Sequence, residues 1–237
     1  MNFLAFAKEL NITGKVLSIT RKKTGEAYNP IKEGCALRSL HYAFNGETIR
    51  LSEDTIACRG GKLGFGFSNE MHVPGGYEHF VSYGAGEGFP PGMRLKRNPE
   101  IAGQGAVNTP NNVMDGYSLI EIKPFQESDE PELVAILANP DQLSALNMLF
   151  HFGKTDNDVT FFPAGSGCST VFLLPFAELR KQEPRAVIGN ADITVRNNFP
   201  ADTLFFTVSG KAFQEMLQDA DGSFLITPAW DKLKERL

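Results

Sequence analysis

Apolar residues recur along this chain at two spacings, which predicts helices and strands in alternation. A first helix is predicted over residues 2–10, where Phe3, Ala7 and Leu10 recur at helical spacing. A first strand is predicted over residues 15–20. Further strands are predicted at 48–51, 54–58, 117–122, 133–138, 159–162, 185–189, 192–195 and 204–208. Further helices are predicted at 35–44, 77–83, 142–150, 170–181, 209–218 and 227–233.

The pattern of these elements predicts the fold class. Residues 133–138 form a continuous apolar run, which is typical of a strand buried on both faces, and Pro140 follows in the first turn of a helix. A second strand, loop and helix follow over residues 159–181. Two adjacent strand-to-helix steps favour a mixed sheet with helices packed on it, either α/β or α+β. We expect one compact domain over residues 1–237.

Three stretches do not follow a regular pattern. Residues 69–110 are rich in glycine and proline, which is typical of a lid, an interface or a binding rim. Residues 124–132 are acidic and are predicted to be an exposed connection. Residues 59–67 alternate glycine with bulky side chains, which fits a loop and a close-packed helix equally well. The aromatic segment 80–89 suggests a homodimer interface, although a packed surface loop explains it as well.

Charge and composition restrict the class of protein. The net charge of −5 argues against a nucleic-acid binder, which needs a clustered basic surface. The apolar run at the N-terminus is too short for a signal peptide, and no stretch approaches the roughly 20 apolar residues of a membrane span. We therefore expect a cytoplasmic protein with no membrane partner. Its three cysteines are an odd number, which argues against a disulfide framework.

Candidate chemistry gathers around the cysteines. Cys168 lies in the small-residue loop 165–169, between a predicted strand and a predicted helix. Cys35 lies in the first turn of a predicted helix, where the helix dipole favours the thiolate. Cys58 precedes the glycine pair Gly60 and Gly61. The sequence contains no Cys-x-x-Cys pair, phosphate-binding loop or known zinc motif.

Several of these segments resemble the DUF169 family of archaea and anaerobic bacteria. The resemblance is carried by Leu-Ala-Asn-Pro-Asp-Gln-Leu-Ser-Ala-Leu at 137–146, Ala-Gly-Ser-Gly-Cys-Ser at 164–169 and Pro-Arg-Ala-Val-Ile-Gly at 184–189. An early cysteine before a helical segment, here 35–43, is similar as well, and the Cys-x-Gly-Gly element at 58–64 matches less closely. The resemblance runs over roughly residues 12–236 and implies no activity. It implies that the three cysteines stand where members of the family tend to carry theirs.

The sharpest hypothesis places Cys35, Cys58 and Cys168 around one metal ion or iron–sulfur cluster. Thiolates bind iron–sulfur clusters, zinc and Cu(I), and small neighbouring residues let backbone N–H groups reach cluster sulfurs. A histidine could complete a zinc site. The candidates are His41, His72, His79 and His151. The alternative is that each cysteine is a small buried apolar residue, which free cysteines often are.

Two metal-free hypotheses remain beside it. Cys168 could be a nucleophile at a helix start, with His151 as the nearest base in the sequence. The small-residue loops could instead bind a small anionic ligand. The residues predicted to bind it are Arg59, Gly60, Gly61, Ser166, Gly167 and Ser169, with Lys62 as a further source of charge. The sequence therefore predicts a small ligand or a redox partner, and it leaves undecided whether the protein is an enzyme.

Overall fold

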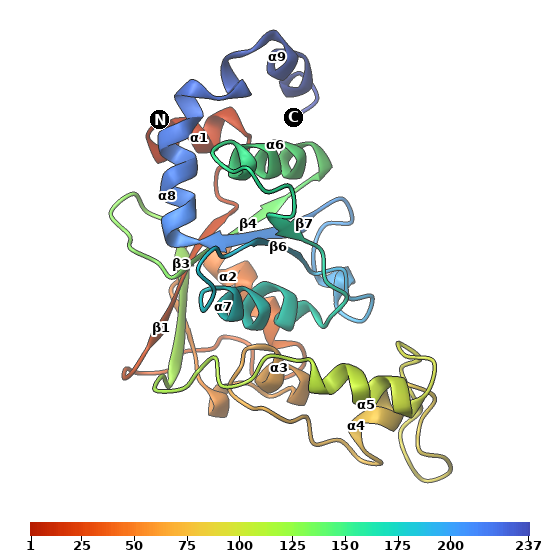
Figure 1. Ribbon diagram of the computed structural model, residues 1–237. Helices are drawn as coiled ribbons and strands as arrows, with labels where there is room; N and C mark the ends of the chain where they lie inside the picture. The colour runs from red at the N-terminus through yellow and green to blue at the C-terminus, as the bar shows by residue number, and fades with distance from the viewer.

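A seven-stranded sheet with helices on both faces forms the centre of the computed structural model, which describes all residues 1–237 (Figure 1). The strand order is β2-β3-β1-β4-β7-β6-β5. The strands are β1 (Val16–Lys22), β2 (Ile49–Leu51), β3 (Leu119–Pro124), β4 (Leu133–Ala138), β5 (Thr160–Phe161), β6 (Ala186–Gly189) and β7 (Leu204–Ser209). All neighbours are antiparallel except β5 and β6, which are parallel. The predicted mixed sheet with helices packed on it is confirmed, in its α+β form.

Strand β4 lies at the middle of the sheet and is buried along its whole length. Its side chains alternate between two apolar cores, with Val134 and Ile136 on one side and Ala135 and Leu137 on the other. This alternation is the geometric consequence of a strand covered on both faces. It explains why residues 133–138 contain no polar position.

The apolar core above the sheet in Figure 1 is built from four helices, of which α9 lies farthest from the sheet. They are α1 (Phe3–Glu9), α6 (Pro140–His151), α8 (Gly210–Asp219) and α9 (Pro228–Lys234). Helix α6 begins with a capping box, in which Asn139 Oδ1 accepts from Gln142 N and Gln142 Oε1 accepts from Asn139 N. The apolar core of this layer has 24 buried residues and contains none of the three cysteines.

The second face is covered by shorter helical pieces, below the sheet in Figure 1. They are η1 (Ala36–Ser39), α2 (Leu40–Phe44), α3 (Arg59–Gly64), the π-helical turn η3 (Ser169–Leu173) and α7 (Leu174–Glu178). Short 3₁₀ turns connect other elements, namely η2 (Glu53–Thr55), η4 (Arg196–Asn198), η5 (Ala220–Gly222) and η6 (Phe224–Ile226). Cys168 belongs to this second core, and Cys35 and Cys58 pack against it.

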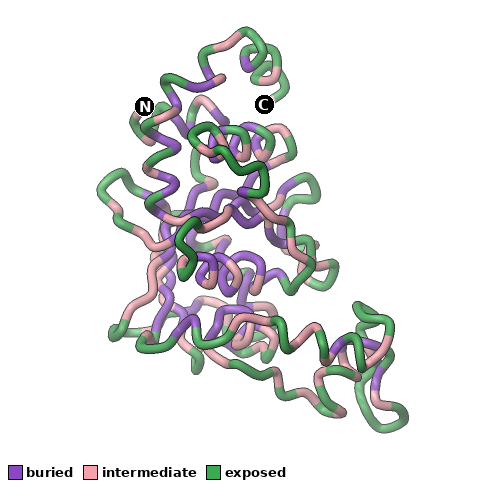
Figure 2. The backbone as a smooth tube through the Cα atoms, in the orientation of Figure 1, coloured by how far each residue is buried: buried purple, intermediate pink, exposed green.

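Helices α4 (Tyr77–Val81) and α5 (Pro99–Val107) form an arm that projects from the body (Figure 1). Figure 2 shows that the arm is mostly exposed, whereas the sheet and the helices beside it are buried. The irregular segment predicted at 69–110 corresponds to this arm, although helix α5 was not predicted. Tyr83 and Phe89 are exposed on it. A homodimer interface at residues 80–89 stays a prediction.

Two predicted strands were wrong. Residues 54–58 contain the end of η2 rather than a strand, because Ser52 and Thr55 form a capping box that closes a helical turn. Residues 192–195 form a turn, in which Asp192 Oδ1 accepts from Thr194 N and Thr194 Oγ1. Local side-chain to backbone hydrogen bonds therefore prevail over apolar alternation in both places. No helix of the structure is long and apolar enough to cross a membrane.

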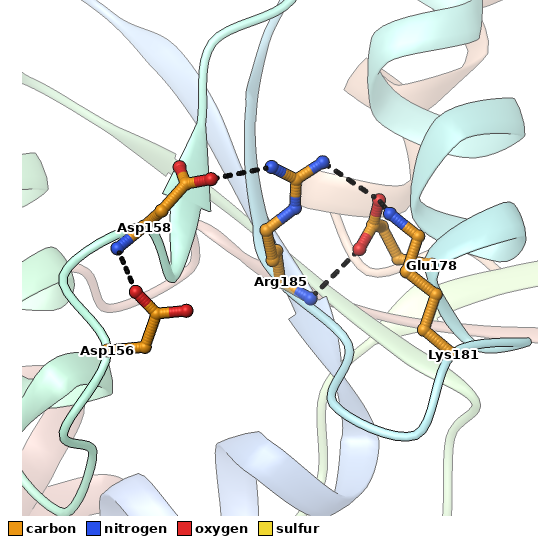
Figure 3. A network of polar contacts seen from close by, with 5 residues as sticks. All are labelled: Asp156, Asp158, Glu178, Lys181 and Arg185. Atoms are coloured by element: carbon orange, nitrogen blue, oxygen red, sulfur yellow. Dashed lines mark hydrogen bonds and ion pairs between the residues drawn. The ribbon is translucent and has the colours of Figure 1, made fainter.

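A buried carboxylate joins α7 to the start of β6 (Figure 3). Glu178 is only 5% exposed. It accepts from Lys181 Nζ at 2.5 Å and from Arg185 N at 3.1 Å. The Arg185 guanidinium lies between Glu178 and Asp158, at 3.5 Å and 3.3 Å. Burial alone would raise the pKa of Glu178, but the bonds from Lys181 and Arg185 outweigh it and lower that pKa.

We predict that Glu178→Gln lowers the free energy of unfolding at neutral pH by about 1–3 kcal/mol, because it removes one charge of a buried network. A lowered carboxyl pKa contributes stability above the unfolded-state pKa and loses it as pH falls through the folded-state value. The difference between variant and wild type should therefore shrink in acid. Denaturant unfolding at neutral pH and at about pH 3 measures it.

The control is Glu215→Gln, which removes the exposed partner of Lys211 on α8 and should change stability very little. An equal loss for Glu178→Gln at both pH values would contradict the assigned role of its charge.

Candidate functional site

Each of the three cysteines stands directly before a short helical turn. Cys35 is the N-cap of η1, Cys58 the N-cap of α3 and Cys168 the N-cap of η3. Cys35 and Cys58 are half-buried and Cys168 is buried. The structure brings the three segments together on the second face of the sheet, so we call Cys35, Cys58 and Cys168 the thiol site.

Close packing of α3 against η3 brings Cys58 into this site. A Cβ on Gly64 would lie 2.5 Å from Cys168 Cβ and 3.0 Å from Ser169 N, so only glycine fits there. A Cβ on Gly61 would lie 2.6 Å from Cys58 Sγ. Both glycines are buried. Residues 59–67, for which the sequence left two interpretations open, therefore begin with a close-packed helix.

Cys35 is the most acidic thiol of the site. Hydrogen bonding from the Cys168 thiol is the largest cause, and it outweighs burial and lowers the pKa of Cys35 to about 6. The backbone N–H groups of Leu37 and Arg38 lower it further. Their contribution is the expected effect of a helix start on a thiolate. Cys35 is therefore mostly thiolate at neutral pH.

Cys168 has the opposite character. Hydrogen bonding to Cys35 and burial raise the pKa of Cys168 well above its usual range, and the charges of Cys35, Cys58 and Asp192 raise it further. The raised pKa of Cys168 does not favour its hypothesised role as an activated nucleophile, which stays a prediction. The position of His151 does not favour it either. That residue ends α6, which packs on the other face of the sheet.

Two residues after β6 belong to the site and were not predicted. Asp192 Oδ2 accepts from Gly167 N at 3.1 Å, and the Asp192 charge opposes ionisation of both Cys35 and Cys168. Asn190 is completely buried, and its Oδ1 lies 2.9 Å from the position that a Cβ on Gly167 would take. The only signal in the sequence was the pair of polar residues Asn190 and Asp192 directly after a predicted strand.

Two backbone N–H groups of the loop 165–169 have hydrogen-bond partners within the protein. Gly167 N donates to Asp192, and Ser169 N donates to Ser166 Oγ at 3.2 Å. Ser166 Oγ and Ser169 Oγ lie 2.7 Å apart. The backbone N–H groups of Gly167 and Ser169 were predicted to face a ligand, but they already have partners within the protein. Anion binding by this loop stays a prediction, and these two N–H groups would have to exchange their present partners to take part in it.

The two predicted basic ligand residues, Arg59 and Lys62, line a surface groove that contains none of the cysteines. The groove is open, has a volume of about 590 Å³ and is also lined by Tyr77 and the segment 68–74. Glu53 and Glu70 line the same groove, so its charge is mixed. A Cβ on Gly60 would lie 3.7 Å from the Met71 side chain, whereas a Cβ on Gly61 would lie against Cys58 Sγ. The predicted ligand residues of this stretch are thus divided between the groove and the thiol site.

None of the four histidines joins the thiols. His41 Nε2 lies 2.6 Å from Asn198 O, and its ring stacks on Phe199. His72 pairs with Glu70, and His79 contacts Tyr83 in the arm. Nor does the structure contain any group of three or more cysteine, histidine, aspartate or glutamate side chains arranged to hold a metal ion.

Comparison with known proteins gives one match. The family model of DUF169, described as "Uncharacterised ArCR", matches residues 5–219. No curated protein and no solved structure matches the chain.

We predict that Gly64→Ala lowers the free energy of unfolding by about 1–3 kcal/mol, because the added methyl group overlaps Cys168 and the backbone of Ser169. The matched control is Gly60→Ala in the same helix, where a Cβ meets only Met71 at 3.7 Å. There the loss of backbone freedom in the unfolded chain should raise stability by about 0.5 kcal/mol. Denaturant unfolding measures both, and equal effects would refute the close contact.

A second prediction concerns the alkylation rate of Cys35 as a function of pH. Since only the thiolate reacts, the rate should rise through an inflection near the pKa of about 6. Cys168→Ala removes the hydrogen bond and should move the inflection upward, toward the ordinary value of 9.0. Cys58→Ala is the control, since Cys58 is not among the causes of the lowered pKa. Mass spectrometry of the labelled peptide identifies the residue, and an unchanged inflection in Cys168→Ala would disprove the pairing.

Proposed function

The chain belongs to the DUF169 family, and we propose that this member binds a thiophilic metal ion or an iron–sulfur cluster through Cys35 and Cys168, with Cys58 as a third thiolate. The observation that carries the proposal is the gathering of all three cysteines at one apolar core, to which Cys168 belongs and against which Cys35 and Cys58 pack. The lowered pKa of Cys35, caused first by the Cys168 thiol, supports it. Thiolates are the ligands that zinc, Cu(I) and iron–sulfur clusters prefer.

The charge around the site supports a cationic occupant. The groups that raise the pKa of Cys168 include two other cysteines and the carboxylate of Asp192. A second thiolate in this half-buried place would be strongly unfavourable without a positive charge beside it. A metal ion supplies that charge and displaces the proton of Cys168, which makes both sulfurs ligands at neutral pH.

The site also has room for an exchangeable ligand. Three cysteines leave one position of a tetrahedral metal, or one iron of a cluster, for water, a substrate or a further ligand. Because the thiols are not arranged as a finished set of metal ligands, binding has to draw Cys58 toward Cys35 and Cys168. A small substrate or a redox partner would then act at the open position, according to the occupant.

A second candidate function is metal-free thiol chemistry, and the low pKa of Cys35 favours it specifically. In this case Cys35, rather than Cys168, attacks an electrophilic small molecule as the thiolate, and Cys168 stabilises that thiolate by its hydrogen bond. The groove along Arg59 and Lys62 is a surface hollow that could hold such a ligand.

Anaerobic purification, an absorption spectrum and metal analysis distinguish the two candidates. We expect a bound metal or cluster in the wild-type protein, nearly complete loss in Cys35→Ser and Cys168→Ser, and weaker loss in Cys58→Ser, because Cys58 lies at the edge of the pair. Glu215→Gln on the exposed face of α8 is the control for handling losses. The same preparations can be labelled with an alkylating agent before and after metal removal.

Bound metal should protect Cys35 from the alkylating agent. Metal-free protein with unprotected, fast-reacting Cys35 would contradict the metal proposal and support the thiol chemistry. Slow, equal labelling of all three cysteines in metal-free protein would contradict both candidates.

A further inference from the structure

Asn190 is a buried amide with no partner. The residue is 0% exposed, and neither Oδ1 nor Nδ2 has a hydrogen bond within the protein. Its backbone, in contrast, is firmly held, because Asn190 N donates to Thr170 Oγ1 at 2.8 Å. A buried amide that lacks its hydrogen bonds destabilises a protein by about 1–3 kcal/mol, so such a group calls for a specific explanation.

The backbone of Asn190 explains only part of the choice of residue. Its φ is +68°, a left-handed conformation that asparagine tolerates better than most residues. Glycine adopts this conformation at least as readily and would leave no amide unpaired. The carboxamide is therefore a cost that the backbone conformation does not require.

The location of the amide supplies the missing reason. Its Oδ1 is 2.9 Å from the Cβ position of Gly167, the residue before Cys168. The same Cβ position is 3.1 Å from Leu37, which lies in η1, the helical turn that Cys35 caps. Two residues further along the chain, Asp192 acts electrostatically on both thiols. The unpaired carboxamide thus lies against the residue before Cys168, and that same residue also lies against the turn that Cys35 caps.

We propose that Asn190 is a positioning residue of the thiol site and that its carboxamide hydrogen-bonds the occupant of that site. This inference rests on the proposed metal-binding function and adds the chemical class of the occupant. A carboxamide has both a donor and an acceptor. Metal-bound water can donate to Oδ1 and accept from Nδ2, whereas the sulfide of a cluster can only accept from Nδ2. A bare ion held by sulfur alone leaves Oδ1 unpaired.

The test uses Cd²⁺ as the probe, because its bonds to thiolates absorb in the ultraviolet and Cd²⁺ in proteins retains water or other oxygen ligands. Asn190→Gly preserves the left-handed backbone and removes the amide. We expect its affinity for Cd²⁺, measured against a competing chelator, to fall about tenfold or more, as is typical when an outer hydrogen bond to a metal site is lost. Its melting temperature should not fall in parallel, because an unpaired buried group has been removed.

Thr207→Val is the matched control. Thr207 Oγ1 is likewise buried without a partner, but it lies within β7. Its removal should leave Cd²⁺ affinity unchanged. A measurement on the wild type makes the test independent of any variant: the side-chain amide resonance of Asn190 should shift when Cd²⁺ is added.

The outcomes distinguish a failure of the role of Asn190 from a failure of the proposed metal-binding function. If Cys35→Ser loses Cd²⁺ while Asn190→Gly binds it as tightly as the wild type and the amide resonance does not move, the inference is overturned and the metal site stands. The amide would then be satisfied by a buried water only. If the wild-type protein does not bind Cd²⁺, the metal-binding function fails, and the role of Asn190 fails with it.

Discussion

The close contact between α3 and the start of η3 is the constraint on which the thiol site depends. Gly64 allows the backbone of α3 to lie directly against Cys168, at a distance that leaves no space for a side chain. Dispersion and burial then fix two helical turns that are far apart in the sequence. Because Cys58 is the N-cap of α3, this contact carries the third thiol to the other two. Helix packing, rather than any sequence spacing, thus creates the site.

The chemistry of the pair follows from the different surroundings of its two sulfurs. Cys35 is half-buried and faces the N–H groups of its own helical turn, which stabilise a negative charge. Cys168 is buried, and the charges near it are negative. One proton is therefore retained on Cys168 and shared with Cys35, and the pair titrates as a unit rather than as two independent thiols. A site of this kind gains from a cation because it already holds one negative charge and resists a second.

The sequence allowed the regular parts of the fold to be predicted, since their patterns arise from burial. Strand β4 was recognisable because both of its faces are covered, and helix α6 because Pro140 and its capping residues mark its start. Helix α3 could not be assigned, because its glycines serve a tertiary contact and have low helix propensity. The turn at 192–195 imitates a strand in sequence but closes through the side chain of Asp192.

For the site, the sequence identified the three cysteines but not which of them has a lowered pKa and which a raised one. Which sulfur is the thiolate depends on which thiol donates to the other, and that is decided by burial and by neighbours from distant segments. Asn190 and Asp192 could not be found for the same reason. They approach the loop before Cys168 only because β6 ends beside η3. The spacing of residues along the sequence does not show that these two elements are neighbours.

The irregular features beside the thiols all lie on the second face of the sheet. The face covered by α1, α6, α8 and α9 has an apolar core of 24 buried residues and none of the cysteines. The other face contains the glycine-rich helix α3, the π-helical turn η3 and the left-handed Asn190 beside the thiols. Irregular backbone and unpaired polar groups of this kind persist only where the surrounding structure supplies the stability. The second layer has an apolar core of 24 buried residues as well, so it stabilises the fold and supports the thiol site at the same time.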